Sequence, residues 1–482
     1  MAIFILVTYF AMLWAVSRAV SKSSGNSAFF GGNRKSPWQL VAFGMIGASI
    51  SGISFVSVPG MVISSQMTYL QTCLGFILGY AVVAFVLLPL YYKLQLTSIY
   101  TYLGERFGRK SEVTGASFFV VSKLIGAALK FYVVCMLLHE LIFEPLGINF
   151  VLTVALMVAL IWTYTRRGGI RALVFTDVLQ TACLLAALVL ICFGVLHALN
   201  LTAGQAVEAI SRHPYSRIFV FDDWMSTQYF WKQFISGAFI VVVMTGLDQD
   251  MMQKNLTCRT LREAQKNMCS YGLAFVPVNL LFLSLGVLLT MLAANLNVSL
   301  PEKTDSLLPM FAATGELGLW AQILFTLGIV AASFSSADSA LTSLTTSFCI
   351  DICRRPNDEQ LRRLSHLGIC AMFVACILVF RYAQSTSLLD AIYTIVSYTY
   401  GPLLGLFFFG IFTKKQVRDK CVPVVCVISP ILTFILDFNS QAWFGGYQFS
   451  HERLLLNAFF TIIGLCCLIK KKDKKNALNS QN

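Results

Sequence analysis

Long apolar segments separated by short polar connections recur along the whole chain. A helix needs about 20 predominantly apolar residues to cross a hydrocarbon core about 30 Å thick, and these segments have that length. The pattern predicts an all-α integral membrane protein with about thirteen transmembrane helices and no separate soluble domain. The expected spans are 2–21, 37–58, 68–92, 115–138, 149–165, 171–196, 229–248, 270–296, 317–350, 365–382, 387–412, 421–437 and 453–470.

Basic residues fall in every second connection between these spans. Lys and Arg concentrate in short cytoplasmic loops. The alternation therefore predicts a multi-pass protein of the cell membrane, the inner membrane in a bacterium, with its N-terminus outside and its C-terminus in the cytoplasm. The clusters are Arg18/Lys22/Arg34/Lys35, Arg106/Arg109/Lys110, Arg166/Arg167/Arg171, Lys254/Arg259/Arg262/Lys266, Arg354/Arg355/Arg362/Arg363, Lys414/Lys415/Arg418/Lys420 and Lys470 to Lys475.

The composition fits this topology and argues against a nucleic-acid partner. Of the 482 residues, 57% are hydrophobic and 12% are charged, and the formal net charge is +13. Cytoplasmic loops that face anionic lipid headgroups explain this excess of basic residues. A nucleic-acid-binding protein would instead gather them on one face of a soluble domain. The lipid bilayer is thus an expected partner, and the oligomeric state is left open.

A hydroxyl-rich run lies inside the ninth expected span, between Ser333 and Ser347. Hydrocarbon cannot hydrate hydroxyls or a carboxylate, so such groups face a bundle interior and often mark an ion or substrate pathway. Oxygens that converge from one face of a helix suit a small, hard cation such as sodium. At 3.6 residues per turn, the residues that share this face are Ala332, Ser335, Ser336 and Ser339, with Asp338 at its edge.

The second expected span is rich in glycine and serine from Gly44 to Gly60. These residues lower the cost of local unwinding, and unwound backbone at membrane depth exposes carbonyl oxygens that a cation or solute can satisfy. The span therefore predicts a broken helix, with close packing of small residues as an equal alternative. The pairs Gly75/Gly79 and Gly401/Gly405 are assigned to helix packing.

Several short motifs along the chain together resemble the sodium:solute symporter family, which includes sodium/glucose, proline and sialic acid cotransporters. The resemblance implies a leucine-transporter-type core of two inverted five-helix repeats at 37–196 and 229–412. An N-terminal accessory helix with an inner loop (1–36), an outer loop (197–228) and two C-terminal accessory helices with a basic tail (413–482) would flank the repeats. Besides the second span, the motifs are Phe29-Phe30-Gly31-Gly32, Gly168-Gly169-Ile170-Arg171, Thr176 to Gln180, Gly246-Leu247-Asp248-Gln249-Asp250, Ser335-Ser336 and Asp351-Ile352.

The resemblance also implies a sodium site between the broken helix and the hydroxyl-rich span. Its ligands would be the carbonyl oxygens of Gly47, Ile50 and Ala332 and the hydroxyls of Ser335 and Ser336. An ion that ties a mobile bundle to a scaffold in one conformation shifts the population toward that conformation, which is a means of coupling. A serine-lined helix contact without an ion is the alternative.

Some relatives have a second sodium site, and the matching positions here are Asp177, Ser335, Asp338 and Ser339. Asp338 stands where the family pattern has a hydroxyl. Two carboxylates would either hold sodium more strongly or leave one of them protonated in the field of the other. The alternative is that Asp177 is an interior hydrogen-bonding residue.

Lys123 and Lys130 lie seven residues apart and so share a face of the third core helix. A buried ammonium needs a partner, and by resemblance Lys130 is favoured to meet a solute carboxylate. Pairing with Asp177 and snorkelling are the alternatives. Ser51 and Ser54 match solute-contacting hydroxyls in sialic acid relatives. Further expected pocket residues are Tyr69, Gln71, Tyr393 and Ser397, whereas a structural role is expected for Asp248, Gln249 and Asp250.

These residues imply a sodium-coupled secondary active symporter, with Na⁺ as its ion, that imports a small organic solute by alternating access. A sugar or an acidic sugar such as sialic acid is favoured over an amino acid, a vitamin or a monocarboxylate. A membrane enzyme is not expected, because Gly-x-Ser-x-Gly is absent and His139-Glu140 lacks the second His of a zinc helix. A receptor-like sensor would need a soluble signalling module, which the sequence lacks.

Overall fold

The computed structural model describes residues 2–20, 25–312, 317–381, 388–449 and 451–470, with the side chains of 2–5, 141 and 388–393 left out. The described chain is helical. Its helices are α1 (Ala2–Val20), α2 (Asn26–Gly31), α3 (Trp38–Ser49), α4 (Gly52–Ser65), α5 (Tyr69–Val82), α6 (Leu88–Lys93), α7 (Thr101–Arg106), α8 (Arg109–Leu138), α9 (Phe150–Ala198), α10 (Ala203–Arg212), α11 (Phe230–Val241), α12 (Gln249–Asn255), α13 (Leu261–Asn295), α14 (Leu307–Ala312), α15 (Leu319–Ser347), α16 (Glu359–Phe380), α17 (Leu388–Phe412), α18 (Val422–Phe438), α19 (Ser440–Trp443) and α20 (Arg453–Cys467).

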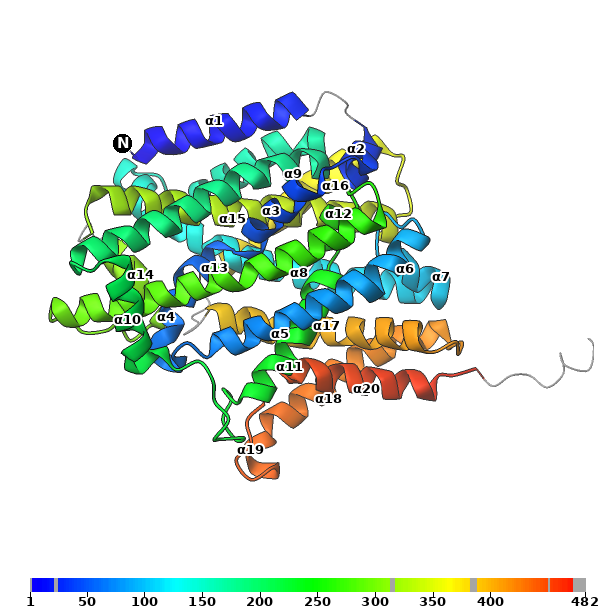
Figure 1. The fold of residues 1–482 in the computed structure, drawn as a ribbon. Coiled ribbons are helices and arrows are strands. Elements are labelled where there is room, and N and C mark those ends of the chain that lie inside the picture. Colours follow the sequence, from blue (N-terminus) through cyan, green and yellow to red (C-terminus); the bar gives the residue numbers. More distant parts are fainter. Residues whose placement is uncertain (1, 21–24, 313–316, 382–387, 450, 471–482) are drawn as a thin grey trace, which may run out of the picture.

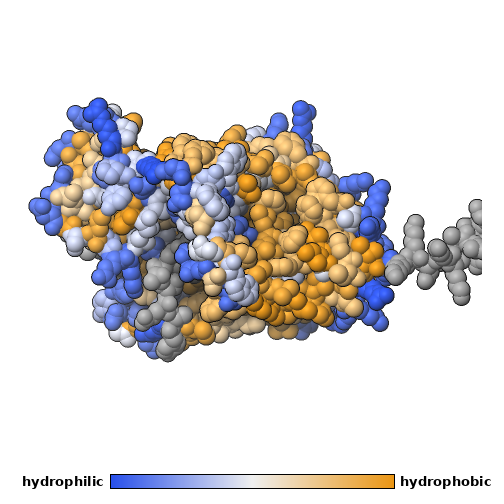
Figure 2. All heavy atoms as spheres, turned by 90° about the horizontal axis from the view of Figure 1, so that it is seen from below, coloured by the Kyte–Doolittle hydropathy of each residue, from blue (hydrophilic) through white to orange (hydrophobic). Residues whose placement is uncertain are grey.

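The long helices lie side by side in one bundle, with α1 along one side and α18 and α20 on the opposite side (Figure 1). Figure 2 shows apolar residues across the middle of the molecule and hydrophilic residues toward both ends. An apolar belt between two polar ends is what a bilayer requires of a spanning bundle. The predicted all-α membrane architecture is therefore confirmed.

Within the described residues, eight helices are long and apolar enough to cross a membrane, or up to ten if each bent pair is one span. All thirteen expected stretches overlap helices. Two of them merge in the 49-residue α9, which has non-helical backbone at Gly169 (φ 48°, ψ −138°). The helices α1, in its part from Leu6 to Val20, and α20 are apolar but shorter than 18 residues. The merged pair in α9 and the two short helices α1 and α20 account for the difference between the thirteen expected spans and the ten found.

Two spans are broken in the middle. The helices α3 and α4 meet at 62°, and α11, which continues to Gly246, meets α12 at 69°. Ile50 and Ser51 have extended backbone between α3 and α4. The break expected from the glycine and serine pattern of the second span is therefore confirmed, and the chain has a second break of the same kind.

The hydroxyl-rich helix α15 runs through the interior of the bundle. It packs against α8, α9, α16 and α4, and every residue from Gly328 to Ser347 is buried. The prediction that these hydroxyls face the bundle interior is confirmed. The GxxxG pairs are packing positions, as expected: Gly75 and Gly79 lie against α11, and Gly401 and Gly405 lie against α20.

Candidate solute and sodium site

The break between α3 and α4 exposes backbone carbonyl oxygens next to α15. In a continuous helix, the N–H groups of Ser51 and Ser54 would bond the carbonyls of Gly47 and Ile50. Here Ser51 is extended and caps α4, and its Oγ accepts from the Ser54 N–H at 3.4 Å. The carbonyls expected to bind sodium are thus at the broken end of α3.

Ser336 joins this break to α15. Its Oγ lies 3.2 Å from the Ala48 carbonyl oxygen and 3.2 Å from the Ala332 carbonyl oxygen, one turn back on its own helix. Gly47 and Ile50 lie one and two residues from Ala48 in the chain, so the Ser336 hydroxyl and the Ala332 carbonyl lie next to the segment that carries the other expected ligands. Gly47 also packs closely against Thr181 of α9, where a Cβ atom would clash.

Ser335 points to a different partner. Its Oγ donates to Oδ1 of Asp177 at 2.7 Å. The other oxygen of Asp177, Oδ2, lies 2.7 Å from the ammonium nitrogen of Lys254, and both of these side chains are 1% exposed. Asp338 accepts from the Tyr164 hydroxyl at 2.8 Å and from Ser339 Oγ at 3.4 Å. The residues expected at a second sodium site are thus buried in two hydrogen-bonded groups, and Lys254 lies against one of them.

The location of Lys254 corrects the sequence analysis, which placed this residue in a cytoplasmic basic loop. It lies on α12, whose seven residues are all buried. The seventh expected span ended at residue 248, but the chain continues into the bundle as a short polar helix. A hydropathy pattern does not detect such a segment. Among the alternatives for Asp177, pairing with Lys123 or Lys130 is excluded, because its cation is Lys254.

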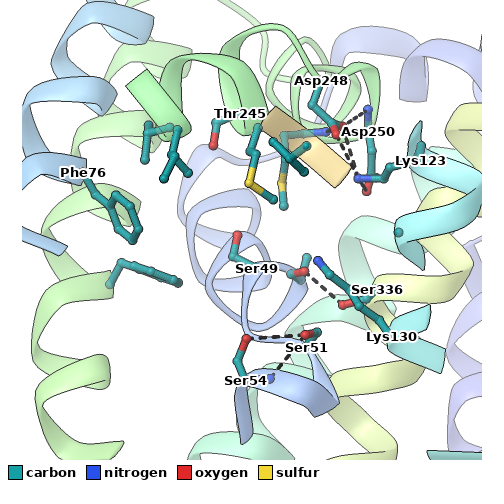
Figure 3. A pocket seen from close by; sticks show the side chains of 18 of the residues that line it. Ser49, Ser51, Ser54, Phe76, Lys123, Lys130, Thr245, Asp248, Asp250 and Ser336 are labelled. Carbon is teal, nitrogen blue, oxygen red and sulfur yellow. Dashed lines mark hydrogen bonds and ion pairs between the residues drawn. The ribbon is translucent and has the colours of Figure 1, made fainter. Parts of the chain in front are cut away.

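A pocket lies between the two breaks and is walled by α5, α8, α13 and α17 (Figure 3). Its aromatic side is formed by Phe76, Tyr80, Tyr271 and Phe275, in which the Tyr80 and Tyr271 rings are 4.7 Å apart. Four of the residues expected to contact solute line this pocket: Ser51, Ser54, Tyr69 and Lys130. Ser336 also lines it, so the pocket adjoins the expected sodium site.

Lys123 forms ion pairs with Asp248 and Asp250 at one end of the pocket, and these three residues are called the clamp below. Its ammonium lies 2.8 Å from Asp250 Oδ2 and 3.1 Å from Asp248 Oδ2. Asp248 also accepts from the Tyr400 hydroxyl at 2.7 Å and caps α12 through the Asp250 N–H at 2.9 Å. These contacts fit the structural role expected for Asp248, but both aspartates also line the pocket, where solute contact was not expected.

Lys130, unlike Lys123, is not paired with an aspartate or glutamate among the described residues. Over the part of the chain that the structure describes, its ammonium has no carboxylate partner within ion-pair distance. Figure 3 shows its side chain on the side of the pocket where Ser51 and Ser336 lie. The pocket therefore holds one paired and one unpaired ammonium on the same helix.

The other expected pocket residues lie elsewhere. Gln71 is fully buried; its Nε2 donates to the Gln228 carbonyl at 2.9 Å and its Oε1 accepts from the Val220 N–H at 3.1 Å, so it ties α5 to the segment before α11. Ser397 is buried outside the pocket lining, and its carbonyl accepts from Asn457 Nδ2 at 3.0 Å. The Tyr393 side chain lies outside the described residues.

A bundle with two broken helices around a polar pocket at their junction defines a multi-span membrane transporter. Residues 29–419 match the sodium:solute symporter family, and the chain belongs to that family. It is accordingly a sodium-coupled solute symporter and not an enzyme, as predicted, and sodium is its co-substrate.

The chain is similar to individual transporters over nearly its full length. It is 26% identical over 474 residues to the sodium/sialic acid symporter SiaT of Proteus mirabilis (strain HI4320), which covers 92% of this chain and 90% of that protein. Its fold resembles that of a Na⁺-coupled sialic acid symporter solved in a substrate-bound outward-open state, with a TM-score of 0.82, 21% identity and coverage of 97% of this chain and 98% of that one.

A second solved structure shares the architecture at lower similarity. It is the nucleobase-cation-symport-1 family transporter Mhp1 in a closed conformation with bromovinylhydantoin bound, with a TM-score of 0.59, 15% identity and coverage of 90% of this chain and 92% of that one. The two solved structures confirm the predicted leucine-transporter-type fold.

Proposed function

We propose that this symporter imports an acidic sugar of the sialic acid type together with sodium. The observation that carries the proposal is the unpaired ammonium of Lys130 in a pocket whose other lysine is paired with two aspartates. An ammonium removed from bulk water is stabilised by an anionic partner. A solute carboxylate supplies that partner. The 26% identity to a sodium/sialic acid symporter over 92% of the chain supports the same solute class.

The remaining pocket residues suit the rest of such a solute. Ser51 and Ser54 offer hydroxyls that donate to and accept from sugar oxygens, and Tyr69 adds a ring and a hydroxyl at the pocket wall. The aromatic side gives an apolar surface for the carbon face of a sugar ring. Gln71 and Ser397 are proposed to support the site from the segment before α11 and from α17 rather than to bind the carboxylate, and Tyr393 stays a proposed pocket residue.

We propose that sodium binds where Ser336 now bridges the break to α15. Its ligands are the carbonyls of Gly47, Ile50 and Ala332 and the hydroxyls of Ser335 and Ser336. Ser335 reaches the ion by turning from Asp177. The bound ion joins the broken helix to α15 at the edge of the solute pocket. Each sodium that enters releases about 2.3 kcal/mol per 100 mV of inside-negative potential, before any concentration difference.

The topology proposed from the charges completes this account. The protein resides in the cell membrane with its N-terminus outside and its C-terminus in the cytoplasm. The inverted repeats cover 37–196 and 229–412, flanked by the accessory segments 1–36, 197–228 and 413–482. The two bent spans support these repeats, because each is the first span of its repeat.

Uptake of labelled N-acetylneuraminate into proteoliposomes tests the solute class, with unlabelled neutral hexoses, amino acids, vitamins and monocarboxylates as competitors. We expect acidic sugars alone to compete strongly. At a solute concentration near half-saturation of wild type, Lys130→Ala should lose most of this uptake, whereas Lys130→Arg, which retains the charge, should keep more of it. Loss of a charge-assisted contact worth about 1.5–3 kcal/mol corresponds to a decrease in affinity of about 10-fold to 150-fold. Uptake by Lys130→Ala with unchanged affinity would remove Lys130 from the site.

A further inference from the structure

The ion pair between Lys254 and Asp177 joins a broken helix to the scaffold. Lys254 comes from α12 and Asp177 from α9, 77 residues apart in the chain. Their charged atoms are 2.7 Å apart, and each side chain is 1% exposed. The pair is therefore held inside the protein and away from water.

Both carboxylate oxygens of Asp177 have a polar neighbour. Oδ2 meets the Lys254 ammonium, and Oδ1 accepts from Ser335 Oγ at 2.7 Å. Ser335 precedes Ser336, the residue that bridges the helix break. The Lys254 ammonium is thus connected, through Asp177 and Ser335, to the residue next to Ser336.

We propose that the Lys254 ammonium takes the place of a second sodium ion at Asp177, so that each transport cycle carries one sodium. This inference rests on the proposed function of the neighbouring sodium site. A sodium ion bound to either oxygen of Asp177 would lie close to the Lys254 ammonium, whose nitrogen is 2.7 Å from Oδ2. Two unit positive charges within a few ångströms repel strongly in a poorly hydrated interior. The lysine supplies the same charge, but it is tethered and does not cross the membrane.

The position of Lys254 on α12 also stabilises its ammonium beside Asp177. It lies in the last turn of α12, where a cation interacts favourably with the helix dipole. Asp250 is one turn earlier on the same face and is itself paired with Lys123 at the pocket. The two ion pairs Lys123–Asp250 and Lys254–Asp177 therefore lie at successive turns of α12.

This assignment has a measurable consequence for charge movement. A solute with one negative charge that enters with one sodium carries no net charge. With two sodium ions, the same solute carries one net positive charge inward. The number of sodium ions therefore decides whether transport depends on the membrane potential.

The test is equilibrium binding of ²²Na⁺ to the purified full-length protein, which requires no knowledge of the solute. We expect wild type to bind one sodium per protein, and Lys254→Ala to bind one more than wild type at saturation. The double variant Lys254→Ala/Asp177→Asn should lose this additional sodium. Thermal unfolding in the absence of sodium shows that each variant is folded.

The outcomes separate this inference from the proposed sodium site. A second sodium in wild type that Asp177→Asn removes would overturn the inference, whether or not Lys254→Ala folds. Loss of the first sodium in Ser336→Ala tests the other site independently. If Ser336→Ala leaves binding unchanged while Lys254→Ala gains a sodium, the proposed site is wrong and the role of Lys254 stands. A folded Lys254→Ala protein that gains no sodium would also overturn it.

Discussion

Replacing Ser336 with alanine removes a hydroxyl that joins the broken helix to α15. Its Oγ is 3.2 Å from each of two backbone carbonyl oxygens, and the residue is 9% exposed. A buried hydroxyl that serves as an ion ligand contributes an amount comparable to a hydrogen bond to a charged group, about 1.5–3 kcal/mol. Since 1.4 kcal/mol is a factor of ten, the sodium concentration for half-maximal uptake should rise at least about 10-fold in Ser336→Ala.

The assay is initial solute uptake into proteoliposomes as a function of external sodium at saturating solute. The maximal rate should change less than the sodium requirement, because at high sodium the site fills again. Ser343→Ala is the matched control: Ser343 is a buried serine of the same helix whose Oγ donates to the Ala340 carbonyl at 2.9 Å. Equal sodium dependence in Ser336→Ala, Ser343→Ala and wild type would refute the assignment of Ser336 as a ligand.

Two further substitutions test the architecture around the site. Lys123→Met leaves Asp248 and Asp250 buried without their shared cation, which should destabilise the protein by about 3–5 kcal/mol. Thermal unfolding of the detergent-purified protein measures this loss, Lys123→Arg should recover part of it, and an unchanged midpoint would show that the clamp contributes nothing. Gly169→Ala places a Cβ atom in a left-handed backbone conformation, 2.6 Å from Phe29 Cα, at a cost of about 1–3 kcal/mol. Its yield of folded protein should fall relative to Gly194→Ala on the same helix, where a Cβ meets nothing within 4 Å; equal yields would contradict this reading of Gly169.

The sequence was informative wherever a polar or flexible residue interrupted an apolar span. The Gly44–Gly60 pattern indicated the break in the second span, and the buried hydroxyls of α15 followed from their conflict with hydrocarbon. Lys130 was conspicuous for the same reason. In each case, a polar or helix-breaking residue lies in a span that hydrocarbon would surround, so the fold must bury it, pair it or break the helix there.

The sequence was least informative at α12. This helix is polar and seven residues long, so hydropathy ended the span before it and grouped Lys254 with the basic loop that follows. The partner of Asp177 lies 77 residues away in the chain and could not be identified from spacing. Gln71 illustrates the same limit, because a polar residue near a span end can face either the pocket or the loop that it supports.

Accumulation of labelled N-acetylneuraminate in proteoliposomes under an inward sodium gradient tests the central claim most directly. We expect the internal concentration to exceed the external one with sodium outside, and to fall back to equality when an ionophore collapses the gradient. Replacing sodium with potassium should abolish accumulation. Accumulation that is equal in sodium and potassium, by protein shown to be folded, would contradict sodium-coupled import of this solute.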